Sequence, residues 1–422
     1  MQHFLAFFAV TLVGVALRLM YGLEIHPASQ AAFSDMKANL VNAHQVYKGL
    51  ESPVVATRHG LFTFLLSPFY HLEHPLQSMN GLMVVLSCVR LLTIGWLCRL
   101  MLAPGAALGL YFLQAVNPLE IDAGAWLLDT SLYGTLLLLL VGTWWRWYLA
   151  GSSRGPLWSV AVGTVAALTL LTRENLLPAL PLGLLWMLRV RGRQALRDGL
   201  FLVLALVITT SPMVARNLRL TGHPYLVTSR GPYNLYYFNS GVRLVRIENS
   251  RQSLRVMSPL FQVNRFAPWY DLRRLLPLQF RQQEEVHRVE TEDGAYWKSR
   301  FWQVQTPGRL LGKGLHLAYL FLVPPWPGGW DSSLAAWLYP ANLLFCLLVA
   351  AGVLARLRRP RLDSADWLLL VFLLGLLVST WITFGEARYR TPYDPLWMIF
   401  AMRYGFAIEG QGPDAEKGVP DE

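Results

Sequence analysis

The sequence predicts an all-α polytopic membrane protein, a bundle of about ten transmembrane helices whose external loops form a small lobe. Of its 422 residues, 54% are hydrophobic and only 15% are charged, whereas a soluble globular protein carries about 25% charged residues. Several apolar runs approach or exceed the roughly 17–20 residues that a helix needs to span a bilayer. So many apolar runs would be hard to keep in solution in a soluble fold.

The apolar runs divide the chain into expected spans. The first run, Phe4–Leu17, lacks a basic start and a clear small-residue cleavage site, so we interpret it as a retained helix and not as a signal peptide. The run His59–Leu72 is shorter than a span and suits an interfacial or re-entrant helix better. The expected spans lie at about 3–22, 79–99, 105–117, 124–148, 157–172, 174–189, 198–215, 334–355, 366–384 and 392–406.

Arginines in the short loops set the expected orientation, because Lys and Arg accumulate on the cytoplasmic side. The strongest signals are RVRGRQALR at 189–197 and RLRRPR at 356–361. With both loops in the cytoplasm, both termini are cytoplasmic and the alternate loops are external. The expected parts are an N-terminal bundle (1–215) with its first external loop (23–78), an external lobe (216–333), C-terminal helices (334–409) and a disordered cytoplasmic tail (410–422).

Charge and cysteine usage narrow the possible partners. Lys and Arg outnumber Asp and Glu by 37 to 26, but the surplus sits in loops, so membrane topology and anionic lipid explain it better than nucleic acid. Cys88, Cys98 and Cys346 fall inside apolar runs and indicate neither a disulfide framework nor a zinc site. His71 and His74 share a helix face without an evident third metal ligand. No cofactor is expected, and the need for a divalent metal is left open.

The predicted topology collects ionisable residues on the external face, several of them at helix ends. Ionisable groups at membrane depth are costly, so function is their default explanation. They come from the stretches FSDMKANL, NPLEIDAG, LLTRENLLP, VARNLRL and TFGEARYRTPYDPLW. The candidates are Asp35, Glu120, Asp122, Arg173, Glu174, Arg216, Asn217, Glu386, Arg388, Tyr389 and Arg390.

Each candidate also has a purely structural interpretation. Asp35 precedes a helical pattern and would serve as an N-cap. The NPLEIDAG carboxylates would form a solvated turn, and the arginine and glutamate of TREN would pair to close a helical hairpin. The two arginines of RYR would extend to lipid headgroups.

Taken together, the candidates suit one kind of reaction. Arginines bind phosphate through paired hydrogen bonds, and a carboxylate can take a proton from an attacking hydroxyl. If a sugar leaves as a lipid phosphate, the leaving group is already stable. One base and a cationic clamp then suffice, and a single displacement inverts the anomeric carbon.

Five stretches between about residue 15 and residue 402 carry a family resemblance. They are SDMKANLVNAHQVYKG, LLTRENLLPALPLGLLW, SPMVARNLRLTGHPYLVTSRGPYNLYYFNS, WKSRFWQVQTPGRLLGKGL and GEARYRTPYDPLW. In this order and spacing the chain resembles the GT-C superfamily of membrane glycosyltransferases. Within it, the chain is similar to bacterial relatives of protein O-mannosyltransferases and of lipid A aminoarabinose transferase.

The resemblance implies an inverting hexosyl- or pentosyltransferase in the bacterial inner (cytoplasmic) membrane. It would move a sugar from a polyprenyl-phosphate donor to a hydroxyl of a glycan, lipid or protein acceptor on the periplasmic, external face. Asp35 would be the catalytic base, with Glu120 or Asp122 as a possible second carboxylate. Donor phosphate would contact Arg388, Arg390, Arg173 and Arg216, supported by Glu174, Glu386, Asn217 and Tyr389.

Departures from the family pattern leave the acceptor open. Asp35 is flanked by Ser34 and Met36, where protein mannosyltransferases tend to place a second carboxylate. Asn39 stands where the family often has Tyr, and Glu174 stands where its hairpin has Pro.

Three other functions remain as alternatives. A ligase-like transferase, similar to O-antigen ligases, would use a pyrophosphate-linked donor and need further arginines. A transporter or flippase for lipid-linked saccharide would carry charges around a midplane cavity and show inverted repeats, but no repeat is visible. A noncatalytic subunit of an export complex would tolerate loss of Asp35.

Overall fold

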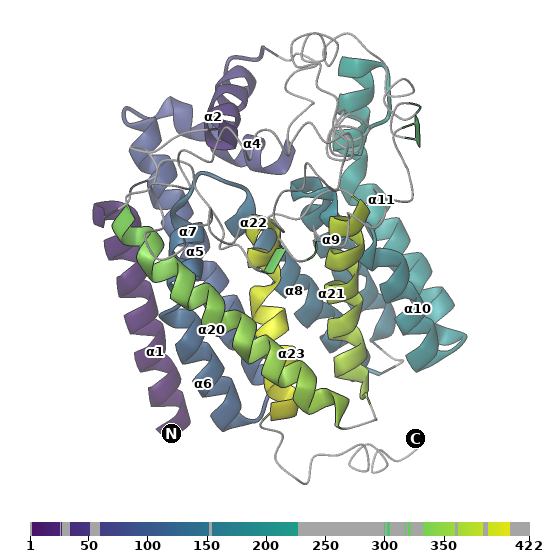
Figure 1. Cartoon of the computed structure of the whole chain (residues 1–422). Coiled ribbons are helices and arrows are strands. Elements are labelled where there is room, and N and C mark those ends of the chain that lie inside the picture. Colours follow the sequence, from purple (N-terminus) through teal and green to yellow (C-terminus); the bar gives the residue numbers. More distant parts are fainter. Residues whose placement is uncertain are drawn as a thin grey trace.

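Helices form all the regular structure over the part of the chain that the structure describes. The computed structural model describes residues 2–25, 27, 34–50, 60–151, 154–226, 299, 302–303, 317, 320–321, 332–358, 362–382 and 387–405. The long helices run side by side, and two short helices cover one end of this bundle (Figure 1).

The N-terminal half supplies most of the bundle. Proline at the first turn of α5, α6 and α7 suits those helix starts, because the proline nitrogen needs no intrahelical partner there. The elements are α1 Gln2–Leu19, a π-helical turn η1 Met20–Ile25, α2 Ser34–Tyr47, α4 Gly60–Leu66, η3 Ser67–His71, α5 Pro75–Met101, α6 Pro104–Ala115, α7 Pro118–Ala125, α8 Thr130–Leu149, α9 Gly155–Thr172, η4 Glu174–Leu176, α10 Ala179–Arg191 and α11 Gln194–Thr221.

The C-terminal half adds two long helices, one shorter helix and two short helical turns. Its elements are α20 Ser332–Leu357, α21 Ser364–Ile382, α22 Ala387–Arg390, η5 Thr391–Tyr393 and α23 Asp394–Gly405. Each of the ten expected spans therefore overlaps one or more of these helical elements.

Fewer of these helices are long and apolar enough to cross a membrane alone. Five pass that test within the described residues: 3–25, 75–101, 155–172, 194–221 and 364–382. The pair α7 and α8 adds a sixth if it counts as one broken span. The segments at 105–117, 174–189 and 392–406 form helices of 12 or 13 residues, which are short for the roughly 30 Å hydrocarbon layer.

Two boundaries differ from the prediction. The expected span 124–148 is interrupted between α7 and α8, which are bent by 119°, so Glu120 and Asp122 lie on a helix and not in a turn. α11 continues to Thr221, so the first residues of the expected lobe belong to a helix. The run 59–72, expected to be an interfacial or re-entrant helix, forms α4 and η3 from residue 60 and is not among the candidate spans, in agreement with that prediction.

Packing is closest where small residues face neighbouring helices. α9 packs extensively against α8 and α11. At Gly163 a Cβ atom would overlap the backbone carbonyl of Leu202 on α11, so only glycine allows the two helices to approach so closely. The interior between helices includes fully buried Trp144, Trp147 and Phe372.

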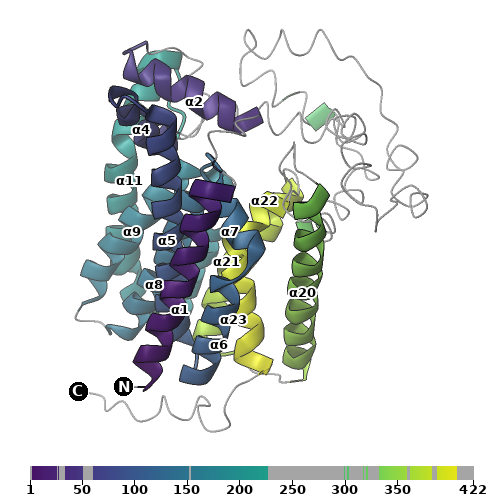
Figure 2. The ribbon, with the colours of Figure 1, turned by 90° about the vertical axis from the view of Figure 1, so that its left-hand side faces the viewer.

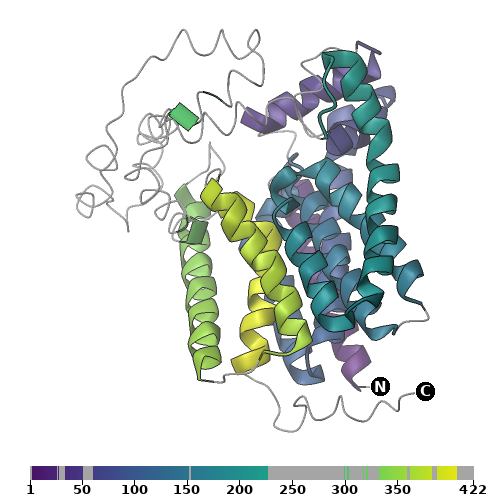
Figure 3. The ribbon, with the colours of Figure 1, turned by 90° about the vertical axis from the view of Figure 1, so that its right-hand side faces the viewer.

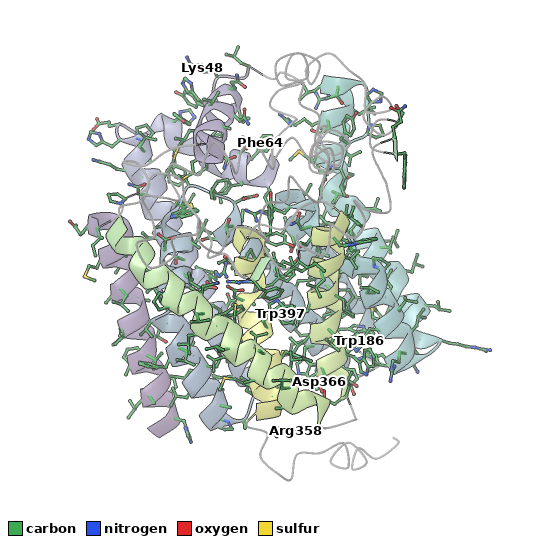
Figure 4. The ribbon with its side chains drawn as sticks, viewed as in Figure 1. Lys48, Phe64, Trp186, Arg358, Asp366 and Trp397 are labelled. Carbon is green, nitrogen blue, oxygen red and sulfur yellow. The ribbon has the colours of Figure 1, made fainter. Side chains whose placement is uncertain are left out.

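Arginine–carboxylate contacts tie the helices together at the end that holds Asp366 and Arg358 (Figure 4). Arg403 of α23 donates to Asp366 at 2.8 Å and to the carbonyl of Met101 at 2.7 Å, and it also pairs with Asp363. Arg191 of α10 pairs with Asp198 of α11 at 3.2 Å. We name this end of the bundle the base.

The opposite end carries α2 and α4, with Lys48 and Phe64 (Figure 4). The start of α1 and the end of α23 both lie at the base (Figure 1), as the predicted topology requires. The expected lobe beyond residue 226 and the tail after residue 409 fall mostly or wholly outside the described residues.

Cysteine labelling on intact cells tests which side each end faces. Glu73→Cys, an exposed position at the α2–α4 end, is expected to react with a membrane-impermeant maleimide. Arg358→Cys, an exposed position at the base, is expected to react only after permeabilisation because arginine-rich short loops stay cytoplasmic. Labelling of Arg358→Cys in intact cells would overturn the orientation.

Candidate functional site

The residues selected from the sequence gather toward one end of the bundle. In Figure 2, α2 runs across this end, above the bundle, with α7 and α22 nearer the helix ends below it. The residues that follow α9 and the last turns of α11 belong to the same end. Candidates separated by up to 355 positions in the chain, from Asp35 to Arg390, therefore come from elements at one end.

Arg90 links three elements in the interior of the bundle. It projects from the middle of α5, where the sequence shows an apolar run, and it is buried. Its Nη2 donates to Oε1 of Glu120 at 2.8 Å and to the carbonyl oxygen of Thr391 at 2.7 Å. A Cβ atom at Gly134 of α8 would overlap its guanidinium. Arg90 thus joins α5, α7 and η5, and glycine on α8 leaves the space for it.

Arg390 is buried and engaged within the protein. Its guanidinium donates to Asp394 at 2.8 Å, to Oδ1 of Asn342 at 2.7 Å and to the carbonyls of Leu320 and Phe321 at 3.1 and 3.2 Å. Its side chain is 0% exposed. A direct contact with donor phosphate, which the sequence suggested, would require these bonds to break. The geometry instead makes Arg390 a residue that fixes α22 and α23 against α20.

Arg173 forms a third buried ion pair of the candidate site, with Asp129. Its Nε donates to Oδ2 of Asp129 at 2.9 Å, and its Nη2 donates to Oγ1 of Thr130 at 2.8 Å. Its guanidinium also lies over the rings of Tyr133 and Tyr389, at 5.6 Å from each centroid. The arginine of TREN therefore pairs with the corner before α8 through Asp129.

A hydrogen bond between two buried tyrosines also connects α8 to η5. The hydroxyls of Tyr133 and Tyr393 lie 2.6 Å apart and share a hydrogen bond. Because Tyr393 belongs to η5 and Tyr133 to α8, this contact adds to the one that Arg90 makes with Thr391. The turn that follows Arg388 is consequently held from two sides.

Asp122 is buried in a different environment from Glu120. It accepts from the hydroxyl of Tyr21 at 2.7 Å and from the indole Nε1 of Trp126 at 3.3 Å. Tyr21 belongs to the π-helical turn η1, a local geometry that is frequent at functional sites. Asp122 is thus held by neutral donors, whereas Glu120 is held by an arginine.

The helix α2, which carries Asp35, is fixed on the corner between α7 and α8. Met36 and Asn39 are buried, and Asn39 donates to the carbonyl of Leu127 at 3.3 Å. Tyr70 of η3 donates to the carbonyl of Leu40 at 2.9 Å. Burial raises the pKa of Tyr70, so the phenol stays protonated and keeps this donor.

Asp35 lies within the first turn of α2, which begins at Ser34. It stands one helical turn before Asn39, the residue that contacts the α7–α8 corner. Its side chain and that of Arg388 fall outside the described side chains, as does Glu386 entirely. Their predicted roles stay predictions.

Arg216 and Asn217 lie near the end of α11, where Arg216 approaches α4. The guanidinium of Arg216 lies 5.0 Å from the ring centroid of Phe64 on α4. Asn217 donates to the carbonyl of Tyr225 at 3.0 Å. Glu174 is half-buried in η4. These contacts hold α4 and the end of α11.

Sequence reasoning missed Arg18, Arg90 and Asp129 as parts of this network. Arg18 on α1 donates to the carbonyls of Gly14 and Ala115, each at 3.0 Å. All three are ionisable residues inside expected spans, and that position alone marks a residue as a functional candidate. Within the described residues, no group of three His, Cys, Asp or Glu side chains is placed to hold a metal ion.

The fold is similar to that of an archaeal oligosaccharyltransferase from Archaeoglobus fulgidus. A crystal structure of that enzyme tethered to an acceptor peptide with an NVT sequon gives a TM-score of 0.52 at 13% identity, over 95% of this chain and 49% of that chain. A structure of the archaeal oligosaccharyltransferase AglB from the same organism, in complex with an inhibitory peptide and a dolichol-phosphate, gives a TM-score of 0.52 at 11% identity, over 95% of this chain and 50% of that chain. No protein-family profile and no curated protein sequence matches the chain.

The chain therefore has an all-α membrane fold like that of this oligosaccharyltransferase, and it spans about half the length of that protein. At such low identity the similarity concerns the fold, and residue roles have to be argued from this chain.

Proposed function

We propose that this protein is an inverting glycosyltransferase that moves a sugar from a polyprenyl-phosphate carrier to an acceptor hydroxyl on the external face of the membrane. The observation that carries the proposal is the similarity of 95% of the chain to the membrane part of a glycosyltransferase that binds dolichol-phosphate, itself a polyprenyl phosphate. A bacterial inner membrane and a periplasmic acceptor follow from the sequence resemblance alone.

In the proposed mechanism Asp35 takes the proton of the acceptor hydroxyl as that oxygen attacks the anomeric carbon. The bond between that carbon and the carrier phosphate oxygen breaks, and the carrier leaves as a polyprenyl phosphate. Arg388 stabilises the phosphate through paired hydrogen bonds. The leaving phosphate needs no proton from the protein, so one carboxylate base is enough.

The buried network supplies positioning in this proposal. Arg90, with Glu120, and Arg390, with Asp394, fix the turn from α22 to η5 that carries Arg388. Arg173 and Tyr389 hold the same turn against α8. A charged residue buried without such a partner would strongly destabilise the fold. The network is therefore compatible with a stable fold only when each of its pairs is complete.

A transporter is less well supported by the same contacts. Alternating access needs the base to open, yet the pairs of Arg403 and Arg191 tie α5, α10, α11, α21 and α23 to their neighbours there. The ionisable residues of the candidate site gather toward the other end.

Binding of a short polyprenyl phosphate to the purified protein in nanodiscs tests the proposal. The wild-type protein is expected to bind the phosphate more tightly than the free polyprenol, and to release it from a polyprenyl-phosphate sugar when an acceptor is supplied. Arg388→Ala is expected to weaken phosphate binding about tenfold or more, and Arg388→Lys less, because lysine keeps the charge and loses the paired bonds.

Two variants serve as controls for this experiment. Arg219→Ala removes an exposed arginine at the same end and should leave binding unchanged. Arg390→Lys should lower the stability of the protein and weaken the binding of polyprenyl phosphate and of polyprenol equally, because the side chain of Arg390 is buried in contacts within the protein. Equal affinity of the wild-type protein for phosphate and alcohol would refute a lipid-phosphate donor.

A further inference from the structure

The turn between α10 and α11 presents arginines at the base that the proposed reaction does not use. Arg189, Arg193 and Arg197 are exposed there. They lie on the last turn of α10, before α11 and on its first turn, and Gly192 with a φ of 55° makes the tight turn between the helices. Figure 3 shows α11 on the side of the bundle opposite to α20.

The acidic side chain in this hairpin is turned inward. Between residues 179 and 221 the only carboxylate is Asp198, and it is fully buried. It accepts from Arg191 at 3.2 Å and from the indole of Trp147 at 3.0 Å. Arg197 also approaches it, at 3.4 Å, with 55% of its side chain exposed. The outer surface of the turn is therefore positive.

Apolar side chains continue directly from the arginines along both helices. On α11, Leu196 and Leu200 are exposed by 63% and 58%, and on α10, Leu185 is exposed by 61%. The stripe on α11 continues through Val203, Leu204, Val207 and Ile208, all exposed. Their spacing of three and four residues places them on one helix face.

This surface matches one kind of molecule in both charge and shape. A phospholipid has a phosphate headgroup at the membrane surface and acyl chains that run along the membrane interior. From Arg193 to Ile208, α11 rises about 22 Å at 1.5 Å per residue, which exceeds the roughly 15 Å of one leaflet. Arginine guanidinium groups bind phosphate oxygens in pairs.

We propose that the α10–α11 hairpin binds an anionic phospholipid at the base, with its headgroup on Arg189 and Arg193 and its acyl chains along Leu185, Leu196 and Leu200. Trp186 fixes this end of α10 at the base: its indole donates to the carbonyl of Ser364, the first residue of α21, at 3.1 Å. Arg189 packs on the ring of Trp367, 4.7 Å from its centroid, so its guanidinium is held at the base as well.

Native mass spectrometry with a mixture of phosphatidylglycerol and phosphatidylcholine tests the site. The wild-type protein is expected to retain phosphatidylglycerol preferentially. The double variant Arg189→Gln/Arg193→Gln is expected to bind it about 30-fold less tightly, from roughly 1 kcal/mol for each arginine near a lipid surface. Phosphatidylcholine binding should change little.

A double variant with the same loss of charge separates a site from general attraction. Arg99→Gln/Arg358→Gln removes two exposed arginines of the base that lie on α5 and at the end of α20. It should keep its preference for phosphatidylglycerol. Equal losses of phosphatidylglycerol binding in both double variants would show diffuse attraction to an anionic surface and would overturn the site. An unchanged preference in both double variants would also overturn it, as would equal binding of the two lipids by the wild-type protein. None of these outcomes depends on glycosyl transfer.

Discussion

Replacing Asp35 with Asn is expected to lower turnover by about 10²–10⁴, the usual contribution of a general base. Asparagine has nearly the same shape as aspartate but cannot take the proton of the acceptor hydroxyl. The helix around it should remain in place, because Met36 and Asn39 make the contacts with the α7–α8 corner. Thermal unfolding and binding of polyprenyl phosphate should therefore change little while turnover falls.

The matched control for this variant is Glu73→Gln, which neutralises an exposed carboxylate at the same end of the protein. It should keep wild-type turnover. If the Asp35→Asn variant also turned over at the wild-type rate, a different residue would have to be the general base. Asp122, which accepts hydrogen bonds from neutral donors, would be the next residue to replace.

Arg90→Met is expected to be among the most destabilising single substitutions in this chain. It removes the partner of Glu120, whose side chain is only 1% exposed, and a carboxylate left buried without a partner costs about 3–5 kcal/mol. It also frees the carbonyl of Thr391. The double variant Arg90→Met/Glu120→Met should be more stable than the sum of the two single losses predicts, because it leaves no lone charge.

Glycine provides an independent test of the same contact. Gly134→Ala should be destabilising in the wild-type background, where the added methyl group overlaps the Arg90 guanidinium, and much less so beside Arg90→Met. Gly109→Ala on α6, where a Cβ atom would meet nothing within 4 Å, is the control. Unfolding free energies from detergent titration measure all of these variants.

The control for Arg90 itself is Arg99→Met, an exposed arginine near the end of the same helix, expected to shift stability by no more than about 0.5 kcal/mol. If Arg90→Met were no worse than Arg99→Met, or if the two losses in the double variant simply added, the contact would contribute little to the fold.

The sequence by itself determined the helices and the end at which most candidates gather. Long apolar runs have to form helices in lipid, since each backbone group needs a partner within its own segment, and all ten predicted runs are helical. The alternation of arginine-rich and arginine-poor loops placed the start of α1 and the end of α23 at one end, and Asp35, the NPLEIDAG carboxylates and the RYR arginines toward the other.

Only the tertiary structure decided which charges meet. Arg90 contacts Glu120 across 30 positions and Thr391 across 301, and hydrophobic periodicity gives neither the rotation of a helix nor its neighbours. The break between α7 and α8 was hidden because Trp126, Leu127 and Leu128, which lie in it, are apolar and continue the hydrophobic run. The burial of Arg390 depends on Asn342 of α20 and Asp394 of α23 approaching together. A charge pattern shows that ionisable residues lie near a membrane surface, but whether each one faces a substrate or a partner inside the protein is set by how the helices pack.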